Sequence, residues 1–122
     1  MMLVSLLIVL YVAIQSDAQQ QVWCVASPGA SSVALQKGLD WACYNGADCS
    51  NIQPNQPCYE PNTVKDHASY AFNSYYQKFK KIGGTCSFGN AAITTNTDPS
   101  KVMVFAILIS FPDSKVQEAW NN

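Results

Sequence analysis

The five cysteines carry the most distinctive chemistry in this sequence. All of them fall between positions 24 and 86, namely Cys24, Cys43, Cys49, Cys58 and Cys86. Cysteines at this density either bind zinc or form disulfides. Zinc is disfavoured, because the chain has no Cys-x-x-Cys pair and His67 is its only histidine. We therefore expect disulfides and no metal, and an odd number of cysteines leaves one thiol unpaired.

Acid catalysis is the second chemistry to consider. A glycosidase needs two carboxylates held across the sugar bond, one of them with a raised pKa. The acids of the central region lie at expected helix ends or in loops, where capping or solvated roles suit them better: Asp40, Asp48, Glu60, Asp66 and Asp98. A cysteine nucleophile paired with His67 is disfavoured because the thiols are expected to be oxidised. We expect no catalysis and no cofactor.

Aromatic residues interleaved with amides offer a third chemistry, the binding of sugars. Sugar rings pack their C–H faces on aromatic rings, while amide side chains satisfy their hydroxyls. The charged fraction is only 12%, the net charge is −1 and there is no arginine. Such a chain has no electrostatic footprint for nucleic acid or an anionic membrane, but a neutral glycan needs none.

Two helices are expected to position these residues. The first runs from Ser31 or Ser32 to about Tyr44, with Trp41 pointing away from its narrow apolar stripe. The second runs from about residue 62 or 63 to 81. Its apolar face is expected to be core and consists of Ala68, Phe72, Tyr75 and Phe79. The opposite, exposed side is expected to hold Tyr70, Asn73 and Gln77.

The remaining segments are shorter. Residues 22–26 have a strand-like pattern, and residues 85–88 and 91–95 are expected to form a hairpin around Gly89-Asn90. Residues 47–61 are expected to be loop. Residues 1–18 have the pattern of a secretory signal peptide, with the mature chain starting near Gln19. A membrane anchor is the competing interpretation, but the apolar run is short for a bilayer core of roughly 30 Å.

Several motifs follow one another in a fixed order between residues 22 and 100. They are Trp23-Cys24-Val25-Ala26, Leu39-Asp40-Trp41-Ala42-Cys43, Asp48-Cys49, Pro57-Cys58, His67-Ala68-Ser69-Tyr70-Ala71-Phe72-Asn73-Ser74-Tyr75-Tyr76-Gln77, Cys86-Ser87-Phe88 and Asp98-Pro99-Ser100. This order resembles the plant X8 domain, carbohydrate-binding module family 43. It implies an α+β fold, a small disulfide-stapled domain with two main helices packed beside a small antiparallel sheet. It also implies non-catalytic binding of β-1,3-glucan (callose) by a secreted cell-wall protein.

Such domains occur as appendages of endo-β-1,3-glucanases or in free-standing proteins such as the plasmodesmata callose-binding proteins. With no glucanase domain before it, this chain is expected to be of the free-standing kind. The rival hypotheses are a glucanase-like fragment with a hydrolytic role and a disulfide-stapled protein-interaction module. The binding face is expected to include Tyr70, Asn73 and Gln77, with Tyr76 and Trp41 in support.

The resemblance also implies a disulfide pairing of Cys24 with Cys86 and Cys43 with Cys49. Locally, Cys43 and Cys49 flank a short turn, and Cys24 and Cys86 lie in strand-like segments that could pair. Cys58 is left as a free thiol, so we expect a monomer with one titratable thiol unless it is buried, or a Cys58-linked dimer.

The chain departs from the family pattern at its end. Residues 1–18 are assigned to the signal peptide, 19–100 to the X8-like glucan-binding domain and 101–122 to a divergent C-terminal tail without the sixth cysteine of the family. Its apolar run, residues 102–111, is either a strand that replaces the missing family segment or the product of a misread exon junction. Because polar residues follow this run, we expect no membrane anchor at this end.

Overall fold

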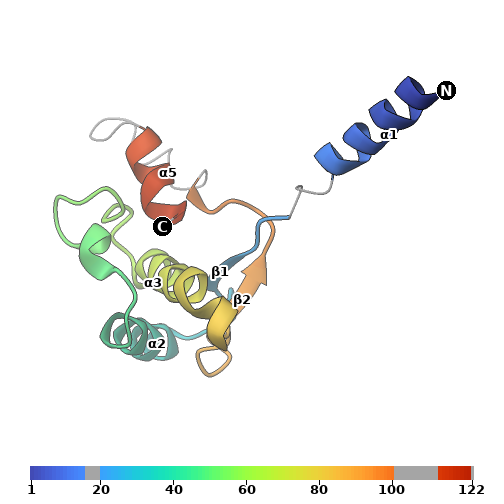
Figure 1. The fold of residues 1–122 in the computed structure, drawn as a ribbon. Coiled ribbons are helices and arrows are strands. Elements are labelled where there is room, and N and C mark those ends of the chain that lie inside the picture. Colours follow the sequence, from blue (N-terminus) through green and yellow to red (C-terminus); the bar gives the residue numbers. More distant parts are fainter. Residues whose placement is uncertain (16–19, 101–112, 122) are drawn as a thin grey trace.

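The computed structural model describes residues 1–15, 20–100 and 113–121 (Figure 1). In chain order the elements are α1 (Met2–Gln15), β1 (Trp23–Ala26), α2 (Ser32–Tyr44), the 3-10 helix η1 (Cys49–Ile52), α3 (Val64–Phe79), the 3-10 helix η2 (Lys80–Ile82), β2 (Ala92–Thr95) and α5 (Asp113–Asn121). The described fold is the expected α+β domain, in which α2 and α3 pack beside a two-stranded antiparallel sheet.

Helix α3 lies at the centre of the domain. It contacts α2, β1, η1 and α5, which surround it in Figure 1. Its middle section, from Ala68 to Ser74, is buried at every position. A helix that is covered all round has no free polar face, so its polar side chains must find partners inside the protein.

Each main helix is capped by one of the two residues at which the sequence predicts its start. The Ser31 side chain accepts a hydrogen bond from the Ala34 N–H, and the Thr63 side chain accepts one from the Asp66 N–H. These caps satisfy N–H groups that have no partner within the helix. Helix α2 ends at Tyr44, as expected, with Asn45 as its C-cap, followed by Gly46 with φ of 110°. Helix α3 ends at Phe79, slightly before the expected residue 81, and continues as η2.

The sheet differs from the expected hairpin. Strand β2 pairs with β1, from Trp23 opposite Thr95 to Ala26 opposite Ala92, and residues 85–88 form no strand. The expected strand at 85–88 is therefore wrong, as is the idea that Cys86 lies in a strand paired with that of Cys24. Phe88 has φ of 48°, in the left-handed region, so the backbone turns there and cannot continue as an extended strand.

The remaining edge of β1 is satisfied by side chains of α3. The Cys24 N–H donates to Asn73 Oδ1 at 3.1 Å, and the Ala26 N–H donates to Ser69 Oγ at 3.0 Å. Both bonds are buried, and leaving such N–H groups unpaired would cost about 1–3 kcal/mol each. Polar residues of α3 therefore hold the sheet against the helix.

Helix α1 stands apart from the other elements in Figure 1, and its large apolar residues up to Tyr11 are exposed. Across the described ranges, no helix has the length and apolar character needed to cross a membrane. The expected cleavage position at residue 18 and the expected strand at 102–111 both lie outside the described residues.

Candidate functional site

The face of α3 that was expected to bind ligand is buried. Tyr70 is 2% exposed and Asn73 is 1% exposed, so the expectation that this side of the helix is free is wrong. The cover is α5, which packs against α3 (Figure 1). The Trp120 ring of α5 meets the Tyr70 ring edge-on, with 5.2 Å between ring centroids. A wheel of one helix cannot show that a distant segment covers it.

The polar atoms on this face hydrogen-bond within the protein. Tyr70 Oη donates to the Ala119 carbonyl oxygen at 3.1 Å and accepts from Asn51 Nδ2 at 2.8 Å. Asn73 Nδ2 donates to the Trp120 carbonyl oxygen at 3.1 Å. Burial raises the pKa of Tyr70 to about 12, so its hydroxyl keeps its proton, and can donate, further into the alkaline range than an ordinary tyrosine. These hydrogen bonds join α5, α3 and η1.

Gln77 and Tyr76 lie nearer the surface but are also engaged. Gln77 Nε2 donates to the Val22 carbonyl oxygen at 2.8 Å and to Asn73 Oδ1 at 3.0 Å. The Tyr76 ring is partly buried, and Lys80 Nζ lies 5.7 Å from its centroid. The structure thus brings Tyr70, Asn73 and Gln77 together, as a scaffold beneath α5 rather than as an open surface.

An open groove lies elsewhere, between α2, α3 and the loop at residues 85–89. It has a volume of about 550 Å³, within the range typical of small-molecule sites. Its lining residues are Ala34, Lys37, Gly38, Trp41, Tyr75, Thr85, Ser87, Phe88 and Gly89. Of the predicted ligand-binding residues, Trp41 alone lines this groove, and the loop residues were not predicted as part of a site.

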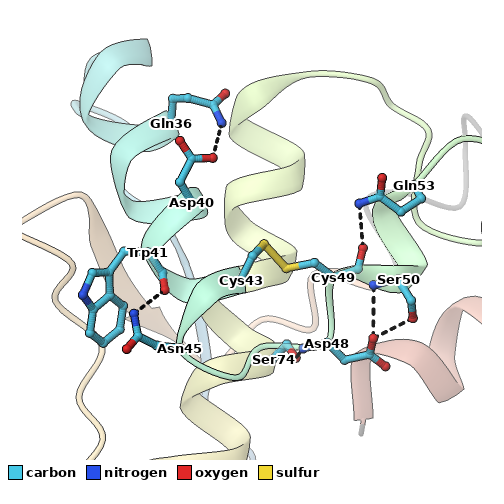
Figure 2. The surroundings of a disulfide bond; sticks show 10 residues. All are labelled: Gln36, Asp40, Trp41, Cys43, Asn45, Asp48, Cys49, Ser50, Gln53 and Ser74. Atoms are coloured by element: carbon cyan, nitrogen blue, oxygen red, sulfur yellow. Dashed lines mark hydrogen bonds between the residues drawn. A yellow bond between two sulfur atoms is a disulfide. The ribbon is translucent and has the colours of Figure 1, made fainter.

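Trp41 is the most exposed of the aromatic residues that line the groove. Its side chain is 49% exposed, although its ring is 5.1 Å from that of Tyr75 and 5.9 Å from that of Phe88, both in edge-to-face geometry. Figure 2 shows the Trp41 ring projecting from α2 away from the Cys43–Cys49 disulfide. The neighbouring rings fix one edge of the indole while much of its surface faces solvent.

The floor of the groove depends on Gly38. Phe72 is fully buried and stacks on Phe88, with ring centroids 4.2 Å apart. A Cβ at position 38 would lie 2.8 Å from Phe72 Cε1 and Cζ. Only glycine therefore lets α2 approach this ring pair closely. The sequence held a signal for this contact, since a glycine inside a helix often marks close packing.

Three of the acids considered as catalytic candidates make local hydrogen bonds. Asp48 caps η1, where hydrogen bonds from the Ser50 side chain and backbone lower the pKa of its carboxyl group. Asp40 accepts a hydrogen bond from Gln36 on its own helix, as Figure 2 shows, and Asp66 pairs with Thr63 at the start of α3. Within the described ranges, no group of three His, Cys, Asp or Glu side chains could hold a metal ion.

The cysteines adopt the pairing implied by the resemblance. Disulfides join Cys24 to Cys86 and Cys43 to Cys49, the second of which links α2 to η1 (Figure 2). Cys58 is free and fully buried. Its burial raises the pKa of the thiol to about 12, so the nucleophilic thiolate is scarce near neutral pH. A dimer linked through Cys58 would first require this region to open.

These features define a small disulfide-linked domain with an open aromatic groove. Its sequence matches the X8 domain family over residues 22–93. The chain belongs to the X8 domain family.

Similar proteins from Arabidopsis thaliana fall into two groups. Glucan endo-1,3-beta-glucosidase 4 is 59% identical over 80 residues, which is 65% of this chain and 16% of the relative. Plasmodesmata callose-binding protein 1 is 45% identical over 98 residues, 80% of this chain and 47% of the relative. Plasmodesmata callose-binding protein 4 is 53% identical over 78 residues, 64% of this chain and 35% of the relative. This chain spans less than half the length of each.

Proposed function

We propose that this protein binds β-1,3-glucan without hydrolysing it and acts outside the cell, in the plant cell wall. The observation that carries the proposal is its membership of the X8 family together with its similarity to two proteins named for callose binding. The open aromatic groove and the low charge of the chain suit a neutral polysaccharide. By similarity to those two relatives, the place of action within the wall would be the plasmodesmata.

Hydrolysis is the less supported alternative. The similarity to the glucosidases covers only 15–17% of the length of several of them, so it concerns this domain and not a whole enzyme. The carboxylates Asp40, Asp48 and Asp66 engage in local hydrogen bonds at three separate places. These capping and pairing roles differ from that of two carboxyl groups held across one sugar bond.

Secretion follows from the same proposal. Residues 1–18 would act as a signal peptide, and α1 is the helical part of that segment. Export would place the chain in an oxidising compartment, where the Cys24–Cys86 and Cys43–Cys49 disulfides can form. We expect the amino terminus of the secreted protein, determined by sequencing, to lie near Gln19.

A sedimentation assay tests the proposal. The chain, secreted from a eukaryotic host through its own leader, is mixed with insoluble β-1,3-glucan, cellulose or chitin, and the protein in each pellet is measured. We expect retention on β-1,3-glucan only, and no release of reducing ends from laminarin. Retention on none of the three polymers would contradict glucan binding and favour a protein-interaction module, whereas released reducing ends would indicate an enzyme.

A further inference from the structure

The groove beside Trp41 combines an exposed aromatic ring with polar groups on its rim. Trp41 is 49% exposed, whereas the other two tryptophans, Trp23 and Trp120, are 8% and 1% exposed. Packing of a core favours burial of such a large ring, so stability alone gives no reason to leave it half in water. An exposed aromatic within a hollow is the feature that sugar binding requires, because the ring can stack on a C–H face.

The ring is also held in place before any ligand arrives. Tyr75 and Phe88 contact it edge-on, and Phe88 is itself anchored by stacking on the buried Phe72. A platform fixed by its neighbours loses little conformational freedom when a ligand binds, which favours affinity. The Asn45 side chain also donates to the Trp41 carbonyl oxygen, as Figure 2 shows, and so fixes the backbone that carries the ring.

The rim supplies hydrogen-bonding groups of the kind that sugar hydroxyls need. Thr85 and Ser87 are exposed loop residues with hydroxyls, each able to donate and to accept. Lys37 provides an ammonium donor and is the one charged residue among those lining the groove. One charged residue in the lining does not make a site for a polyanion, whereas its ammonium group can donate hydrogen bonds to neutral hydroxyls.

We infer that this groove is the glucan-binding site, with Trp41 as the platform on which a glucose ring stacks and Lys37, Thr85 and Ser87 as partners for its hydroxyls. The inference rests on the proposed function and specifies where the glucan lies. It assigns a different role to Tyr70 and Asn73, whose polar groups hold α5 in place. The glucan then binds without displacing α5.

The test compares two exposed aromatic residues of the same helix. Trp41→Ala removes the platform, while Tyr44→Ala removes a ring that is 92% exposed and lies outside the groove residues. We expect Trp41→Ala to weaken retention on β-1,3-glucan on the order of 10-fold, the loss corresponding to one good aromatic contact. Tyr44→Ala should be retained like the unmodified protein. Trp41→Phe, which keeps a ring, should fall between them.

A second measurement follows fluorescence quenching in the unmodified protein, with Trp41→Phe as its control. Acrylamide should quench mainly the emission of Trp41, since Trp23 and Trp120 are buried. Saturating soluble β-1,3-gluco-oligosaccharide should reduce that quenching, and Trp41→Phe should abolish this protection. Glucan retention with unchanged quenching, or equal retention of Trp41→Ala, would overturn the assignment of the groove while leaving glucan binding intact. No retention of the unmodified protein would overturn both.

Discussion

Tyr70 of α3 and Trp120 of α5 are in edge-to-face contact, with 5.2 Å between their ring centroids and an angle of 77° between their planes. Tyr70 also donates a hydrogen bond to the carbonyl oxygen of Ala119, next to Trp120. Two apolar residues of α5, Val116 and Trp120, are each 1% exposed. Residues 113–121 are thus packed into the domain, although the sequence assigned them to a divergent tail.

Truncation of Trp120 should therefore destabilise the whole domain. We expect Trp120→Ala to lower the free energy of unfolding by about 3–5 kcal/mol, the usual cost of removing a large buried aromatic side chain. Glu118→Ala, an exposed change in the same helix, is the matched control and should change it by less than about 0.5 kcal/mol. Urea unfolding of both variants measures the difference. A loss at Trp120 as small as that at Glu118 would contradict the packing of α5.

The Tyr70 hydroxyl gives a finer test of the same contact. Tyr70→Phe keeps the ring but leaves Asn51 Nδ2 and the Ala119 carbonyl oxygen without this partner. We expect a loss of about 1–3 kcal/mol in unfolding free energy, the penalty of unsatisfied buried polar groups. Retention on β-1,3-glucan should stay unchanged under conditions where the variant is folded. Weaker retention by the folded variant would instead support a direct contact between Tyr70 and glucan.

The helices and their ends could be predicted because their signals are local. Ser31 and Thr63 lie where side-chain oxygens can cap a helix, and the spacing of Ala68 and Phe72 defines one buried face whatever packs against it. The disulfides Cys24–Cys86 and Cys43–Cys49 were implied by the order of motifs. Periodicity could also indicate that Trp41 points away from the stripe of α2, and it does.

The site could not be predicted in the same way because it depends on contacts between distant segments. The exposure of Tyr70 and Asn73 is decided by α5, and their environment cannot be read from α3 alone. The groove needs the loop at Phe88, whose left-handed backbone turns it back against α2, where a strand was expected. The spacing of residues along one helix indicates neither the cover by α5 nor the turn of the loop at Phe88.

The buried thiol of Cys58 should make stability fall at alkaline pH. Burial raises its pKa to about 12 in the folded protein, against about 8.5 for an ordinary cysteine. Between these values the unfolded chain has lost the proton that the folded protein still binds, so the free energy of unfolding falls as pH rises. The upper limit of this slope is about 1.4 kcal/mol per pH unit.

Cys58→Ala should remove this contribution. We expect the stability of the variant to decline less between pH 8 and pH 10 than that of the unmodified protein, when each is compared with itself at pH 8 by urea unfolding. Because each protein is compared with itself, any stability that the variant loses through its smaller side chain does not affect the comparison. Above about pH 10 the Tyr70 hydroxyl, whose pKa is also raised to about 12, adds a similar decline in both proteins. Equal declines below pH 10 would contradict a buried protonated thiol.

Gly38 links the packing of the core to the shape of the groove. Alanine usually stabilises a helix by about 1 kcal/mol relative to glycine, so Gly38→Ala would help α2 in isolation. Its Cβ, however, would lie 2.8 Å from two carbons of Phe72 and 3.4 Å from the Cβ of Phe88. Phe72 is fully buried and stacked on Phe88, so the ring cannot withdraw without moving the floor beneath Trp41.

We therefore expect Gly38→Ala to destabilise the protein by roughly 1–3 kcal/mol, the typical cost of overpacking a core, and to weaken retention on β-1,3-glucan. Gly29→Ala is the control, because a Cβ there meets nothing within 4 Å and its φ lies outside the left-handed region. The stability of Gly29→Ala in urea and its retention on β-1,3-glucan should both stay close to those of the unmodified protein. If Gly38→Ala is as stable and as well retained as Gly29→Ala, α2 does not pack closely against Phe72. The proposal that this contact fixes the floor of the groove would then be contradicted as well.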